Sequence, residues 1–122
     1  MKLPNGERAY INMVKLRGYS LSATHREGKH KARVFAAALG IGPEQADWLR
    51  DQLLQAAREL DCELGKRDEH GQRYIIDLTA TFGRKSARLR SAWNARPGED
   101  FPRLVSCYVL DEWRAERPGE IA

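Results

Sequence analysis

The amino-acid sequence predicts an α+β domain, with two or three N-terminal helices packed on one face of an antiparallel meander of three to four strands. Two patterns lead to this fold class. Up to residue 60, apolar residues recur at the spacing of amphipathic helices. After residue 71, apolar and polar residues alternate with a period of two, and short turn-rich segments separate the runs. Helices that precede such a meander can cover one face of the sheet and leave the other accessible.

Residues 28–40 predict the helix around which the rest of the chain is organised. Its expected apolar stripe consists of Ala32, Phe35, Ala36 and Leu39. Gly40 is expected to end the helix in a left-handed conformation. Four basic side chains crowd the first turn, namely Lys29, His30, Lys31 and Arg33. Because a helix dipole disfavours cations at its N-terminus, this placement indicates an anion site, and a solvated basic helix end is an equally good interpretation of the spacing.

Two further helices are expected, one on each side of this central helix. Asn12 has the side chain of an N-cap for a short helix that ends at Gly18. Pro43 suits the first position of a longer helix. The apolar stripe of the longer helix consists of Ala46, Leu49, Leu53, Ala56, Ala57 and Leu60. Trp48 falls outside this stripe, where it could cover an edge or meet a partner, and His25 lies in a polar loop.

Three strands are predicted in the second half of the chain, over residues 72–80, 86–94 and 103–110. Residues 8–11 could add a fourth as a short edge strand, whereas residues 65–71 are expected to form a turn-rich link. Residues 1–110 then make one domain, as expected for a chain of 122 residues, and residues 111–122 form a polar C-terminal tail.

The composition is that of a globular protein with a charged surface, with 42% apolar and 31% charged residues. A formal net charge of +4 permits an acidic partner or nucleic acid without demanding either. Neither Cys62 nor Cys107 stands in a metal-ligand spacing, so we expect reduced, buried thiols and no metal or other cofactor. Since the sequence has neither a signal peptide nor an apolar run of transmembrane length, we expect a cytoplasmic protein that does not engage the membrane, or a fragment delivered by other machinery.

The accessible face of the meander is expected to carry several arginines that could grip phosphates through paired hydrogen bonds. By alternation, the outward residues are Arg73, Asp77, Arg88 and Arg90, joined by Arg103 or Ser106 depending on the register. The simpler interpretation is that arginine–carboxylate pairs only keep the sheet soluble. Ser91 has no Ser-His-Asp context, so a hydrolase triad is not supported.

Metal-free cleavage of RNA would give these groups a role. The reaction needs a base for the 2′-hydroxyl, an acid for the leaving oxygen and cations for the extra negative charge on phosphorus. His30 could be the base or the acid. The groups that could supply the charge are Lys31, Arg33 and Arg90. The second proton-transfer group stays open, with His25 and His70 as candidates.

Four segments together resemble an uncharacterised bacterial domain family. They are GKHKARVF with ALG at residues 28–40, GQRY at 71–74, RSAW at 90–93, and DFPRL with CY at 100–108. The match runs from about residue 1 to residue 110. Members of that family resemble small stand-alone proteins accompanied by a small partner protein.

More distantly, the pattern is similar to nuclease domains at the C-termini of contact-dependent inhibition and other polymorphic toxins. Many of these are metal-independent endoribonucleases, including RelE-like and colicin-type toxins, with N-terminal helices before an antiparallel sheet. The resemblance implies an RNA substrate and a small cognate antitoxin or immunity protein. The chain departs from the distant toxins at position 30, where they often have a small residue or lysine, so catalysis by His30 is an inference from the residues alone.

The sequence therefore predicts a toxin-like, metal-independent endoribonuclease that a small cognate protein neutralises. The candidate catalytic residues are His30, Lys31, Arg90 and Ser91, and the candidate nucleic-acid-binding residues are Lys29, Arg33, Arg73, Arg88 and Arg103. The alternative is a non-catalytic protein- or nucleic-acid-interaction module of a bacterial two-gene system, which would use Trp48, Trp113 and the basic face. A third hypothesis is a binding protein for a phosphorylated small molecule.

Overall fold

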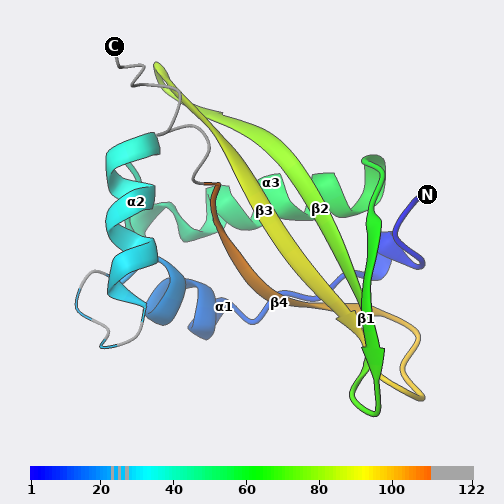
Figure 1. Ribbon diagram of the computed structural model, residues 1–122. Helices are drawn as coiled ribbons and strands as arrows, with labels where there is room; N and C mark the ends of the chain where they lie inside the picture. Colours follow the sequence, from blue (N-terminus) through cyan, green and yellow to red (C-terminus); the bar gives the residue numbers. More distant parts are fainter. Residues whose placement is uncertain (23, 25, 27, 111–122) are drawn as a thin grey trace.

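The computed structural model describes residues 1–22, 24, 26 and 28–110. It shows helices followed by a four-stranded antiparallel sheet, so the predicted α+β fold class is confirmed (Figure 1). The helical elements are η1 (Gly6–Arg8), α1 (Met13–Lys15), η2 (Leu16–Ser20), α2 (Lys29–Leu39), η3 (Pro43–Gln45) and α3 (Ala46–Glu59). The strands are β1 (Glu63–Asp68), β2 (Gly71–Phe82), β3 (Lys85–Ala95) and β4 (Pro102–Val109). His25, Trp113 and the tail predicted for residues 111–122 lie outside the described residues.

Most helix ends follow local sequence signals. The Asn12 side chain accepts a hydrogen bond from the Lys15 backbone N–H at 3.2 Å, as expected of an N-cap. The short helix then continues as the π-helical turn η2 to Ser20, past Gly18, where it was expected to end. Gly40 ends α2 with φ 71°, in the left-handed region that favours glycine.

Two residues predicted to belong to the apolar stripes, Ala36 and Leu60, are exposed instead of buried. The buried residues of α2 are Ala32, Phe35, Ala38 and Leu39. Ala36 is exposed, because the side of α2 that packs on β3 and β4 includes Ala38 in its place. Leu60 keeps 39% of its surface exposed, because α3 ends at Glu59 and the Leu60 backbone is already extended. The other stripe positions of α3 are buried as expected.

The sheet is a meander with the strand order β1-β2-β3-β4. Its first strand, β1, covers much of the segment that was expected to be a turn-rich link. The sequence did not predict this strand, because residues 66–68 are charged and show no alternation of apolar and polar side chains. An edge strand that is exposed along most of its length does not need such alternation. The expected N-terminal edge strand is reduced to an isolated parallel bridge between Tyr10 and Arg103, beside the start of β4.

The longer helices α2 and α3 pack on the inner face of the sheet, and α1 and the first turn of α2 lie at its β4 edge. In Figure 1, α3 crosses behind the strands and α2 stands beside β4. The inner face carries fully buried Ile76, Leu89 and Trp93. On the opposite side, no described helix covers the strands, and we call this side the outer face. It carries Arg73, Asp77, Arg88, Arg90, Asn94, Arg103, Ser106 and Tyr108.

Both cysteines are free and buried. Burial raises the pKa of the Cys62 thiol, and it raises the pKa of the Cys107 thiol to about 12. Because the thiolate is the reactive form, neither side chain is suited to nucleophilic chemistry. Within the part of the chain that the structure describes, no helix has the length and apolar character to cross a membrane.

Candidate functional site

A bulge in β4 places both Arg103 and Ser106 on the outer face, although the sequence predicted only one of them there. The register between β3 and β4 shifts between Ala92 and Trp93. On one side of the bulge, Ser106 pairs with Ala92. On the other side, Arg103 pairs with Asn94. Since directly opposed residues share one side of an antiparallel sheet, Ser106 and Arg103 both lie on the outer face, whereas unbroken alternation would place only one of them there.

The first turn of α2 meets the edge strand β4 at Tyr108, whose side chain belongs to the outer face. The Lys31 Nζ atom lies 5.3 Å from the centroid of the Tyr108 ring, within range of a cation–π contact. A pocket of about 210 Å³ lies here, and His30, Lys31 and Tyr108 are among the residues that line it. Arg90 is the cross-strand partner of Tyr108 in β3. We call His30, Lys31, Arg90 and Tyr108 the Tyr108 cluster.

Arg90 is fixed in this cluster by a carboxylate of the neighbouring strand. Its Nε atom donates to Asp77 Oδ1 at 2.8 Å, and its Nη2 atom donates to Asp77 Oδ2 at 2.9 Å. This pairing raises the pKa of Arg90, to which Tyr108 also contributes, and lowers the pKa of Asp77. Arg90 therefore stays charged in one orientation. Because a guanidinium has five N–H donors, it keeps others for a further acceptor.

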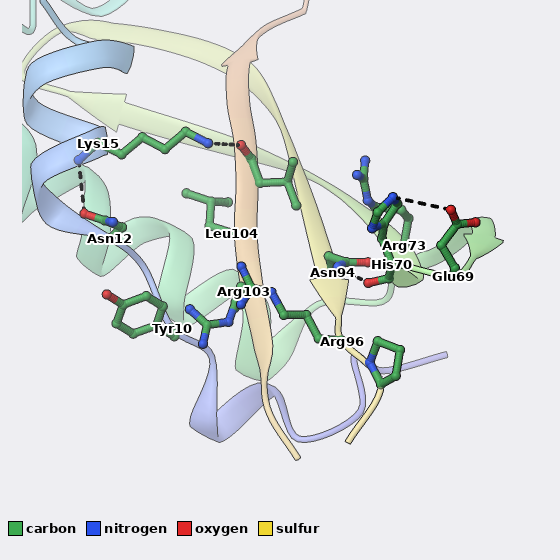
Figure 2. Close-up of a pocket in the computed structure, with 12 residues that line it drawn as sticks. Tyr10, Asn12, Lys15, Glu69, His70, Arg73, Asn94, Arg96, Arg103 and Leu104 are labelled. Carbon is green, nitrogen blue, oxygen red and sulfur yellow. Dashed lines mark hydrogen bonds and ion pairs between the residues drawn. The ribbon is translucent and has the colours of Figure 1, made fainter. Parts of the chain in front are cut away.

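A larger cleft of about 650 Å³ lies nearer the β1–β2 turn, and we call it the basic cleft (Figure 2). Its cationic lining residues are Lys15, Arg73, Arg96 and Arg103. His70 and a single carboxylate, that of Glu69, complete its charged lining among the described residues. The basic cleft and the Tyr108 cluster are separate, since Asn94 and Arg90 are about 13 Å apart along β3 at about 3.3 Å per residue.

The arginines of the basic cleft differ in how they are held. Arg103 donates from Nε and Nη2 to the Glu99 carboxylate at 3.0 and 2.9 Å, which raises the pKa of Arg103 and lowers that of Glu99. Its guanidinium carbon lies 5.2 Å from the Tyr10 ring centroid and 5.0 Å from that of Phe101. Arg73, by contrast, forms no ion pair with any described residue. Arg96 is held more loosely, with its Nη1 atom 4.0 Å from Glu99 Oε2. Of the three arginines in the cleft, two therefore share the Glu99 carboxylate and Arg73 has no carboxylate partner among the described residues.

Comparison with known protein families identifies one match. A family model described as Domain of unknown function (DUF6883) matches residues 2–111. The chain belongs to the DUF6883 family. No curated protein and no solved structure matches it. The expected membership of an uncharacterised domain family is confirmed, and both the Tyr108 cluster and the basic cleft fall within the matched residues.

Three predicted nucleic-acid-binding residues of this DUF6883 domain line neither pocket. Lys29 is half-buried and Arg33 is exposed, and both lie on α2 close to His30 in the chain. Arg88 is exposed on the outer face, where its Nη1 atom donates to Thr79 Oγ1 at 2.9 Å. These residues add positive charge near the Tyr108 cluster but do not form part of it.

Ser91 lies on the inner face, away from the other predicted site residues. Its exposed fraction is 0%. The Ser91 hydroxyl donates to the Ile76 carbonyl oxygen at 2.9 Å and accepts a hydrogen bond from Trp93 Nε1 at 2.9 Å. This geometry gives Ser91 a structural role, because a substrate on the outer face has no access to its hydroxyl.

Replacing Ser91 with alanine should lower the free energy of unfolding by about 1–3 kcal/mol, because the buried Trp93 N–H and Ile76 carbonyl lose a partner. Ser106→Ala, on the half-exposed outer face, is the matched control and should change it by less than about 0.5 kcal/mol. Urea unfolding followed by Trp fluorescence measures both. A Ser91→Ala protein with unchanged stability and lost activity would contradict the structural role.

The sequence did not single out several residues that the fold brings to these sites. Tyr108 belonged to the motif set and to an expected strand but was given no role in the site, and Lys15 and Arg96 were given none either. His70 lies in the basic cleft, so it does not share the pocket of His30. Trp48 is half-buried and packs against Phe82 with ring centroids 5.0 Å apart. Among the described residues, no group of three or more His, Cys, Asp or Glu side chains could hold a metal ion.

Proposed function

We propose that this DUF6883 domain is a toxin-like endoribonuclease that cuts RNA without a metal ion and is neutralised by a small cognate protein. The observation that carries the proposal is the convergence on Tyr108. The basic first turn of α2 supplies His30 and Lys31, and the open face of the sheet supplies Arg90. His30 and Lys31 thereby line one accessible pocket with Tyr108, and Arg90 lies behind Tyr108 as its cross-strand partner.

The chemistry is an internal transesterification of RNA. A base removes the proton of a 2′-hydroxyl, whose oxygen forms a bond to the adjacent phosphorus. The bond from phosphorus to the 5′-oxygen of the next nucleotide breaks, and an acid gives that oxygen a proton. The products are a 2′,3′-cyclic phosphate and a free 5′-hydroxyl, so no cofactor or oxidant enters the balance.

The residues of the Tyr108 cluster match these needs. We assign His30 to one proton transfer and the Tyr108 hydroxyl to the other. Lys31 stabilises the negative charge that develops on the phosphoryl oxygens. Arg90 shares its charge with Asp77. Since Arg90 is the cross-strand partner of Tyr108, its main role is to orient that side chain and to add one fixed N–H donor.

The small neutralising protein is proposed on physical grounds as well as by resemblance. The chain has a net charge of +4, and its outer face carries arginines that no described helix covers. An acidic protein of complementary shape could cover this face and associate quickly through electrostatic steering. Such a partner would exclude RNA from the Tyr108 cluster and from the basic cleft at the same time.

The test is cleavage of a single-stranded RNA by the purified chain in excess EDTA. We expect cleavage to persist in EDTA and to yield 2′,3′-cyclic phosphate ends, identified by mass spectrometry. One 2′-deoxy substitution at the mapped cut site should abolish cutting there, because the attacking oxygen is gone. Cleavage that requires a divalent cation, or that leaves a 5′-phosphate, would contradict the mechanism.

The non-catalytic interaction module is the alternative that the same experiment decides. Trp48, a contact residue of that alternative, packs on Phe82 and stays half-buried. The other support of the alternative is the basic outer face, which either function would use. A chain that binds RNA, leaves it intact and does not slow bacterial growth when expressed alone would favour the module and exclude the nuclease.

A further inference from the structure

We propose that the basic cleft binds a single-stranded segment of RNA beside the cleavage site, with its phosphates on Arg73, Arg96 and Arg103 and a base against Tyr10. The inference deepens the proposed function and rests on it in so far as the bound RNA is the substrate. It assigns a ligand to a part of the molecule that the cleavage chemistry does not use.

The charge of the cleft favours an anionic ligand. Four permanent cations line the cleft against one carboxylate among the described lining residues. Glu99, outside the lining, pairs with Arg103 and lies 4.0 Å from Arg96, so the positive charge in excess is that of Arg73 and Lys15. Among the described residues, Arg73 has no ion-pair partner, and the Lys15 Nζ atom donates to the Val105 carbonyl oxygen at 3.2 Å. Cations crowded into a concave surface of low dielectric produce a strong positive potential. A phosphate would relieve this repulsion.

The arrangement of the arginines favours an extended chain of phosphates over a single one. Arg73, Asn94 and Arg103 are paired residues of β2, β3 and β4, so they form a row across the outer face. With neighbouring strands about 4.8 Å apart, the backbones of Arg73 and Arg103 are about 10 Å apart. Arg96 lies after β3, between them in strand order (Figure 2). Separate guanidinium groups at this spacing can bind separate phosphates.

The aromatic ring beside the arginines favours a nucleic acid over an acidic protein. Tyr10 lines the cleft and is 44% exposed, so part of its ring is open to a ligand. Arg103 and the Phe101 ring, whose centroid lies 6.4 Å away at 74°, hold Tyr10 in place. Exposed, fixed rings next to basic side chains are how single-strand-binding proteins stack bases. A duplex hides its bases and would gain nothing from Tyr10.

The position of the cleft suits a substrate that also reaches the Tyr108 cluster. Both sites lie on the outer face, and about 13 Å of β3 separates them. A single strand that crosses the sheet could place one phosphate at Lys31 while its neighbours bind the cleft. The cleft would then add affinity and orientation to the cleavage reaction without touching the reacting atoms.

Fluorescence anisotropy with a labelled 2′-O-methyl RNA of about ten nucleotides, which cannot be cleaved by transesterification, tests the inference. Arg73→Gln should weaken binding about tenfold through the loss of a charge-assisted hydrogen bond. It should also lower the slope of log affinity against log salt by about 0.7, the value for one phosphate contact of a single strand. Tyr10→Leu should weaken binding at least about fivefold.

Arg58→Gln is the matched control, because Arg58 is exposed on α3, behind the sheet. It should leave the affinity within about twofold of wild type. Thermal melting of each variant verifies that it is folded, and Arg73→Lys should restore part of the affinity by returning the charge. These comparisons separate a cleft contact from a general change in net charge.

Three results would overturn the inference. They are equal binding by Arg73→Gln and Arg58→Gln, equal affinity of wild type for a duplex of the same sequence, and displacement of the RNA by polyglutamate of equal charge. The last would identify a surface for an acidic protein. The probe cannot be cut, so this binding result stands even if the chain proves not to cleave RNA. If the chain cleaves RNA but Arg73→Gln binds the probe as tightly as wild type, the proposed role of the basic cleft is wrong and the proposed nuclease activity is not affected.

Discussion

Replacing His30 with alanine should lower the rate of RNA cleavage by about 10²–10⁴-fold, the usual contribution of one positioned acid or base. His30 is exposed and lines the pocket at Tyr108, so the loss should come from proton transfer and not from unfolding. Tyr108→Phe removes only the hydroxyl assigned to the second proton transfer, and it should reduce the rate over a similar range. Single-turnover cleavage of a labelled RNA measures both rates directly.

The matched control for this experiment is His70→Ala. His70 lies in the basic cleft, so its loss should raise KM and leave kcat within a few-fold of wild type. If His70→Ala loses kcat while His30→Ala cleaves normally, the proton chemistry belongs in the basic cleft. Equal melting temperatures of wild type and His30→Ala are needed to exclude loss of the folded protein.

The sequence predicted the fold because most of its elements carry local signals. Asn12 and Gly40 cap helices, and the alternation in residues 72–94 follows from one buried sheet face. The strand β1 carries no such signal, because most of its residues are exposed and charged. It forms because it pairs with β2. Such pairing depends on the neighbouring strand and cannot be read from the residues of β1 alone.

For the candidate site, the sequence predicted which kinds of residue take part but not how they are arranged in space. The sequence showed a basic helix start and arginines at alternate strand positions, but not which of them meet. The meeting of Lys31 with Tyr108 depends on how α2 packs beside β4. The bulge that places Arg103 and Ser106 on one face depends on the register of two strands. Ser91 was chosen for its residue type, and strand alternation, which buries it with Trp93, already argued against access to it.

Gly71→Ala should reduce the free energy of unfolding by about 3–5 kcal/mol, the largest effect on stability that we expect of a small substitution. Gly71 has φ +129°, a backbone conformation that residues other than glycine rarely adopt. A Cβ atom there would collide with the Ala95 carbonyl oxygen and would lie 2.9 Å from the Ala95 carbonyl carbon. The neighbour is backbone of the paired strand β3, so it cannot turn aside as a flexible side chain could.

Gly83→Ala separates the collision from the backbone strain. Gly83 also has positive φ, at +62°, but nothing lies within 4 Å of the Cβ position, so its replacement should cost only about 1 kcal/mol. Urea unfolding compares the two variants on one scale. Equal losses would mean that β2 and β3 do not approach each other at Gly71 as closely as the structure shows.

The same substitution connects stability to the proposed function. Asn94 Nδ2 donates to the His70 carbonyl oxygen at 2.9 Å, and an added Cβ at Gly71 would lie 3.0 Å from Asn94 Oδ1. Relief of the collision must therefore move the wall of the basic cleft that carries His70 and Arg73. In the folded fraction of Gly71→Ala, RNA binding should weaken more than cleavage of bound RNA, because the Tyr108 cluster lies about 13 Å away along β3. Equal losses of both would mean that the two sites act as one.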